Sequence, residues 1–221
     1  MTGEIPDTIT DQAVAAAVNI VFCLPNVYIK QGMFPAHTRA IALFPERREM
    51  PQFTLALDKF NHYSTSINHL LVAGNRVDVQ SYEAIWQIIS EGVHRTHPFY
   101  GHFEIQKGSE NVKEQADWIA GQISARKIKH TFLITSQWHM PRVFLTLSKS
   151  LIINGMGQTT IIEPVAAPVD WFAPIPGGDG TSPNDEVFKE MRRIADYQKK
   201  GHVATLEELR DYVHFICSMA T

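Results

Sequence analysis

Short apolar runs alternate with longer segments of helical periodicity along most of this chain. The apolar runs are bounded by turn residues and predict buried strands. The longer segments repeat apolar positions at steps of three and four residues, as at Trp118, Ile119 and Ile123, which predicts helices with one face against a sheet. The predicted strands are residues 40–44, 69–73, 103–106, 131–135 and 159–164. The predicted helices are residues 52–63, 81–91, 111–126, 141–151, 185–200 and 206–218.

This alternation predicts an α/β fold, a Rossmann-like three-layer sandwich with a mostly parallel sheet, because strands joined through helices pair in parallel and are covered on both faces. Residues 1–39 precede the regular pattern and are expected to form an N-terminal helical extension. Residues 40–221 are expected to form one Rossmann-like domain with C-terminal helices. The segment 171–183 is dense in glycine and proline, and both a mobile lid and a simple surface connection fit it.

Composition and charge limit the class of function. Of the residues, 44% are hydrophobic and 19% are charged, with a formal net charge of -3, as in an ordinary soluble globular protein. Basic residues are scattered among acidic ones, so no nucleic-acid partner is expected. The apolar run 13–24 is interrupted by Asn19 and is shorter than the roughly 20 residues of a membrane helix, so no membrane association and a cytoplasmic location are expected. Cys23 and Cys217 have no metal-type spacing, which predicts two reduced, buried thiols, with a disulfide only in an oxidising compartment.

Polar residues follow the second and third predicted strands, at the sheet edge where open parallel sheets bind ligands. Gly74 and Asn75 come directly after residues 69–73, and they suit a turn that approaches a ligand closely. Glu104 belongs to the third strand. Ser109, Asn111 and Glu114 lie at the start of the following helix. They are more polar residues than one helix cap requires, so the sequence is compatible with a ligand site there as well as with a simple cap.

The strongest site signal comes at the end of the fourth predicted strand. Thr135 and Ser136 end this strand, and His139 and Arg142 open the next helix, with Pro141 in its first turn. An arginine there can hold a phosphate or carboxylate group in a fork, and a histidine can act as general acid or base near neutral pH. We therefore expect Arg142 and the Asn111 helix start to hold an anionic or nucleotide-like ligand, and His139 with Glu104 or Glu114 to transfer protons.

Two other chemistries are less well supported by the sequence. A serine hydrolase built on Ser136 and His139 would need a nucleophile elbow with flanking glycines, which the segment 135–139 lacks. A metal site could be drawn from His94, His97 and His102, but their spacing is not that of helical ligands, so no metal is expected.

Two segments together resemble the signature segments of the bacterial YdcF-like family. The segment 102–116 resembles the strand with a glutamate and the helix start that follows it, and the segment 132–147 resembles the family's Thr-Ser-x-x-His-x-x-Arg turn. Gly74 and Asn75 stand where two glycines are usual, and Glu190 with Tyr197 resembles the closing helix. The resemblance extends over about residues 40–197.

The resemblance implies a Rossmann-like sheet and, for soluble members of the family, a nucleotide-like ligand such as S-adenosylmethionine. Because neither a redox motif nor a metal cluster is present in the sequence, an enzyme of this kind would be a transferase or hydrolase acting on a phosphate-containing or adenosyl substrate. A non-catalytic ligand sensor or interaction module is the alternative. The sequence does not indicate the ligand's identity or the oligomeric state.

Overall fold

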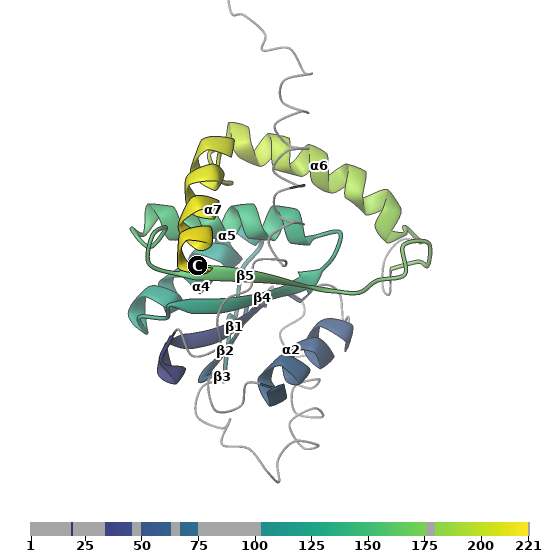
Figure 1. Ribbon diagram of the computed structural model, residues 1–221. Coiled ribbons are helices and arrows are strands. Elements are labelled where there is room, and N and C mark those ends of the chain that lie inside the picture. Colours follow the sequence, from purple (N-terminus) through teal and green to yellow (C-terminus); the bar gives the residue numbers. More distant parts are fainter. Residues whose placement is uncertain are drawn as a thin grey trace, which may run out of the picture.

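The computed structural model describes residues 34–45, 50–62, 67–74, 103–175 and 180–220, together with residue 19. It confirms the predicted α/β fold, with one sheet of five parallel strands in the order β3-β2-β1-β4-β5 and helices on both of its faces (Figure 1). The strands are β1 (Arg39–Leu43), β2 (His69–Val72), β3 (Phe103–Ile105), β4 (His130–Ser136) and β5 (Ile161–Ala167). The helices are α2 (Met50–His62), α4 (Val112–Ala125), α5 (Met140–Ile153), α6 (Pro183–Lys199) and α7 (Leu206–Ala220), with a short 3-10 helix at Ala36–Thr38. The predicted helix 81–91 and almost all of the expected extension lie outside the described residues.

The two faces of the sheet pack against different helices because side chains alternate along a strand. Ile41 and Leu43 of β1 belong to an apolar cluster with Phe53 of α2. Ala40 and Ala42 of the same strand belong to the cluster that contains α4 and α5. Figure 1 shows the result, with α2 on one side of the sheet and the other labelled helices on the opposite side.

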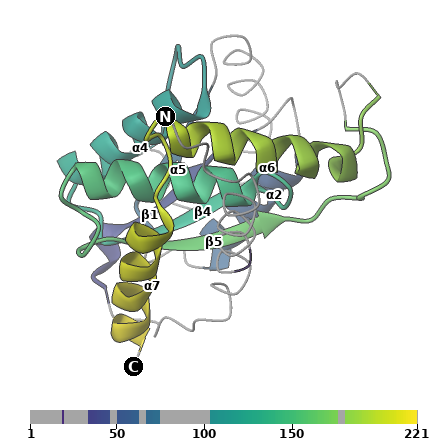
Figure 2. The ribbon, with the colours of Figure 1, turned by 90° about the horizontal axis from the view of Figure 1, so that it is seen from above.

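Helix α5 is buried on nearly all sides, because the sheet covers one of its faces and α6 and α7 cover the other (Figure 2). The fully buried Tyr212 of α7 connects this outer layer to β5: its hydroxyl group donates a hydrogen bond to the Thr160 carbonyl (3.0 Å) and accepts one from the Ile162 amide (2.9 Å). Helix α7 is therefore fixed to the sheet by polar contacts as well as apolar ones.

The bounds of β5 differ from the prediction. This strand begins at Ile161 and continues to Ala167, pairing along its whole length with β4, whereas the sequence pattern indicated residues 159–164. Pro164 lies within the strand and does not end it. Because β5 is at the edge of the described sheet, one side of its backbone needs no ladder hydrogen bond, and an edge strand tolerates a proline.

Two features near the C-terminus correct smaller expectations. Helix α6 begins at Pro183, because Ser182 and Asp185 form a capping box, and not at residue 185. Cys217 lies on α7 and is exposed, so the prediction of a buried thiol at this position was wrong. Cys23 lies outside the described residues. In the part of the chain that the structure describes, no helix has the length and apolar character needed to cross a bilayer.

Candidate functional site

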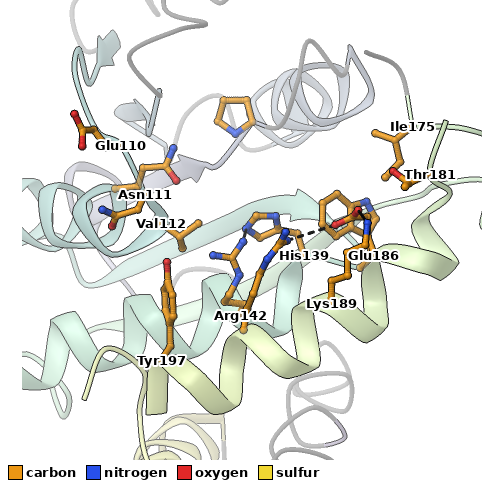
Figure 3. Close-up of a pocket in the computed structure, with 14 residues that line it drawn as sticks. Glu110, Asn111, Val112, His139, Arg142, Ile175, Thr181, Glu186, Lys189 and Tyr197 are labelled. Atoms are coloured by element: carbon orange, nitrogen blue, oxygen red, sulfur yellow. Dashed lines mark hydrogen bonds and ion pairs between the residues drawn. The ribbon is translucent and has the colours of Figure 1, made fainter. Parts of the chain in front are cut away.

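A cavity of about 480 Å³ lies at the carboxyl edge of the sheet, beside the ends of β1 and β4 (Figure 3). In the sheet, β2 and β3 lie on one side of β1, whereas β4 and β5 lie on its other side. The boundary between β1 and β4 is therefore the switch point at which open α/β sheets bind ligands. The lining residues come from the turn after β1, the start of α4, the β4–α5 turn, the segment before α6 and one face of α6. They are Pro45, Glu110, Asn111, Val112, Gln115, Trp138, His139, Arg142, Ile175, Thr181, Glu186, Lys189, Arg193 and Tyr197.

Asn111 lines this cavity and also caps α4. Its side-chain oxygen accepts a hydrogen bond from the Glu114 amide (3.0 Å), and its side-chain nitrogen donates to one Glu114 carboxylate oxygen (2.8 Å). The other oxygen accepts from the Glu110 amide (2.8 Å). Both carboxylate oxygens of the exposed Glu114 are thus engaged in the cap, and Glu114 does not line the cavity.

Two backbone carbonyl groups directly after β2 hold the start of α4 in place. The buried Ser109 hydroxyl donates a 2.5 Å hydrogen bond to the Gly74 carbonyl, and the Gln115 side chain donates to the Ala73 carbonyl at 2.7 Å. Ser109 and Gly74 do not line the cavity, so their hydrogen bond positions the Asn111 helix start beside it. Asn75 lies outside the described residues.

The β4–α5 turn brings His139 and Arg142 into the cavity. Thr135 and Ser136 are completely buried at the end of β4 and do not line the cavity, which also argues against Ser136 as a nucleophile. His139 occupies the N-cap position of α5 but makes no side-chain capping hydrogen bond there. Its imidazole is 5.2 Å from the Trp138 ring, measured between centroids.

Arg142 is the centre of a buried polar network. Its Nε donates to one oxygen of Glu190, and its Nη2 donates to the other at 3.1 Å. Nη2 also lies 3.3 Å from His139 Nε2, and the guanidinium carbon lies 5.5 Å from the centre of the Tyr197 ring. Arg193 donates a further hydrogen bond to Glu190. The Arg142 and Glu190 side chains are 8% and 2% exposed, so this fork is screened from water.

The network keeps Glu190 ionised. Burial alone would raise the pKa of its carboxyl group, but electrostatic interactions with His139 and Arg142, together with hydrogen bonds from Arg142 and Arg193, lower the pKa below its ordinary value of 4.5. A lowered folded-state pKa means that the unfolded chain binds the proton more tightly than the folded protein. The contribution of Glu190 to stability is therefore complete above pH 4.5 and is lost as the pH falls through the folded-state pKa.

We expect the free energy of unfolding to fall more steeply with acid in the natural protein than in a Glu190→Gln variant, because glutamine has no proton to take up. Urea denaturation at several values between about pH 6 and about pH 3 measures this difference. The two curves should converge at the acid end. Parallel curves through this range would show that the folded-state pKa of Glu190 is not lowered.

Charged side chains of α6 complete the cavity wall opposite α4. Glu186, Lys189, Arg193 and Tyr197 follow one another at helical spacing along one face. The Glu186 carboxylate pairs with Lys189 at 2.6 Å and with Arg193 at 3.4 Å, and both cations are about half exposed. The cavity rim therefore carries cations whose position is set by a neighbouring carboxylate.

Of the residues selected from the sequence, the structure brings Asn111, His139 and Arg142 together in the cavity. Glu104 is not among the lining residues, because it forms an ion pair with Arg126 after α4. Within the described part of the chain, the carboxylate that interacts with the His139–Arg142 pair is that of Glu190. Sequence reasoning missed the site roles of Glu190 and of the charged face of α6. The helical spacing of these residues indicates that they share one face of a helix, but it does not indicate which part of the sheet that face lies over.

A metal site finds no support among the described residues, which contain no group of three or more histidine, cysteine or acidic side chains placed to bind an ion. His94, His97 and His102 lie outside them. Comparison with models of known protein families gives no match, and comparison with curated proteins finds no significantly similar sequence.

Proposed function

We propose that this protein is YdcF-like and binds a small, nucleotide-like ligand with one anionic group in the cavity at the switch point. The observation that carries the proposal is the geometry of Arg142. Its Nε and Nη2 are held by Glu190 and His139, while its Nη1 makes no hydrogen bond within the described part of the chain and Arg142 lines the cavity. A guanidinium held in this way loses little freedom when it binds a carboxylate or phosphate group.

The start of α4 supports the same ligand class. Asn111 and Val112 line the cavity, so the end of the helix with unpaired backbone N–H groups and positive partial charge borders it. Together with Arg142 on the facing element, this helix end would contact an anionic group from two sides.

The charge balance of the wall favours one anionic group over a polyphosphate. Arg142, Lys189 and Arg193 are opposed by Glu110 and Glu186 on the wall itself. Glu190 neutralises Arg142 from behind. A wall of mixed sign suits a zwitterionic ligand or one with a single carboxylate or phosphate group, and S-adenosylmethionine, with its carboxylate and positive groups, is of this kind. If this molecule is the cofactor, Arg142 would hold its carboxylate and Glu110 or Glu186 its positive groups, and it would supply a transferable methyl group.

Binding without catalysis is the alternative, and one contact favours it. Arg142 can only donate, so in its contact with His139 the Nε2 atom acts as acceptor. A histidine in this state cannot take up a ligand proton at Nε2 unless the contact opens. A transferase or hydrolase reaction would therefore need ligand binding to separate His139 from Arg142.

A thermal-shift screen against nucleotides, S-adenosylmethionine, sugar nucleotides and phosphosugars tests the proposal. We expect a stabilising compound whose affinity falls by about 3- to 10-fold in Lys189→Gln, because an exposed cation at the rim contributes modestly to anion binding. Lys199→Gln is the matched control, since Lys199 is exposed on the same helix but does not line the cavity. No shift with any compound, or equal binding by both variants, would contradict the proposal.

The same stabilising compound decides between catalysis and binding alone. Incubation with the natural protein and with His139→Gln, followed by product analysis, should show turnover only in the natural protein if His139 transfers a proton. Binding without turnover in either protein supports the sensor alternative.

A further inference from the structure

A second, smaller cavity of about 170 Å³ shares Trp138 as a wall with the cavity described above. Most of its other walls are apolar and come from the start of α5, the segment after β5 and residues 184–194 of α6. Its lining residues are Gln137, Trp138, Pro141, Trp171, Asn184, Val187, Phe188, Glu190, Met191 and Ile194.

This small cavity lies at the same edge of the sheet as the larger one. Gln137 and Trp138 directly follow β4, and the Gln137 amide donates a 3.3 Å hydrogen bond to the carbonyl of Ala167, the last residue of β5. The larger cavity therefore borders the ends of β1 and β4, and the smaller one borders the ends of β4 and β5. Both lie where the fold places ligands.

Helix α6 presents a different face to each cavity. Its charged face, defined above, lines the larger one, whereas Val187, Met191 and Ile194 line the smaller one. With 3.6 residues per turn, these two sets form neighbouring stripes on one helix. Glu190 connects them, because it lines the small cavity while its carboxylate binds Arg142 in the large one.

The size and walls of the small cavity suit one planar or apolar group. An apolar protein cavity of about 150 Å³ can hold a benzene molecule. Trp138, Trp171 and Phe188 provide aromatic surfaces, and Phe188 is 63% exposed although it is large and apolar. An aromatic side chain left open to water beside an apolar cavity is a typical place for a ligand ring to pack.

We infer that the small cavity binds an aromatic or apolar group of the same ligand whose anionic group lies in the larger cavity. This inference rests on the proposed function and narrows the ligand to molecules that join a planar apolar group to one anionic group, as nucleoside monophosphates do. Trp138, as the common wall, lies between the two parts of the bound ligand.

Calorimetric titration with adenosine 5′-monophosphate and ribose 5-phosphate tests the inference, because these probes share the phosphate and the sugar and differ in the base. The natural protein should bind the nucleotide about tenfold more tightly, as expected for stacking of one base on aromatic side chains. Val187→Phe fills the small cavity and should remove this advantage without changing the affinity for ribose 5-phosphate. Gln198→Phe introduces the same ring on α6, away from both cavities, and should leave both affinities unchanged.

Phe188→Ala provides a second test with little risk to the fold, because Phe188 is mostly exposed. It should weaken binding of the nucleotide alone. Equal affinities for the two probes in the natural protein, or an advantage of the nucleotide that persists in both variants, would overturn the inference and leave the proposed function standing. Failure of both probes to bind would contradict the proposed function and the inference together.

Discussion

Replacing Arg142 by methionine is expected to lower the free energy of unfolding by about 3 kcal/mol, because the change leaves the carboxylate of Glu190 buried without its main partner. Arg193 continues to donate to Glu190, which places the expected loss at the lower end of the range for broken buried pairs. Urea denaturation near neutral pH measures the effect, and methionine keeps most of the side-chain volume, so that little of the loss comes from a cavity.

Two further variants separate the charge effect from a general loss of packing. The double variant Arg142→Met with Glu190→Leu removes both charges of the buried pair, so most of the lost stability should return. Arg210→Met is the matched control: Arg210 is 61% exposed and pairs with Glu207 and Asp211 on the surface of α7, so its loss should change stability by less than about 1 kcal/mol. Equal effects of Arg142→Met and Arg210→Met would mean that the buried fork does not form.

The Arg142–Glu190 pair affects both the stability of the fold and the proposed ligand affinity, and a binding assay has to separate these two effects. Arg142 is proposed both to hold the ligand and to neutralise Glu190, so a loss of binding in Arg142→Met alone could reflect either role. The double variant restores the fold without restoring the guanidinium. A double variant that is stable and still does not bind would assign the lost affinity to Arg142 itself.

Phe144→Ala is expected to lower the free energy of unfolding by about 3 to 5 kcal/mol, the cost of removing a buried ring and leaving a cavity. Phe144 has no exposed surface, and its ring centre lies 6.2 Å from that of Tyr212, so it packs in the layer between α5 and α7. Thermal or urea unfolding measures the loss. Two-state analysis applies only if circular dichroism and fluorescence give the same transition.

Phe188→Ala is the matched control for this prediction, because it makes the same change at a residue that is 63% exposed. Its stability should change by less than about 1 kcal/mol. A small effect of Phe144→Ala, comparable with that of Phe188→Ala, would show that α7 does not pack on α5 as the structure has it.

Much of the fold was predictable because its periodicity is local. The apolar runs and helical stripes identified each described strand and long helix, and their alternation indicated the parallel sheet. The errors arose at residues whose secondary structure or burial depends on which residues surround them in the folded protein. Pro164 reads as the end of a strand, but it is tolerated within β5 because that strand lies at the edge of the described sheet. Cys217 reads as buried within an apolar segment, but it faces away from the core on α7.

The sequence by itself determined the α/β architecture and the position of Asn111, His139 and Arg142 at the starts of helices that follow strands, because strand and helix periods and turn residues are encoded over a few neighbouring positions. Only the tertiary structure decided which carboxylate joins them. Glu104 and Glu114 are close to Asn111 along the chain, but Glu104 pairs with Arg126 and Glu114 takes part in the α4 cap. Glu190 binds Arg142 although the two residues are 48 positions apart in the sequence. The packing of α6 over α5 makes this pairing, and such packing depends on the whole surface of both helices, which no local pattern contains.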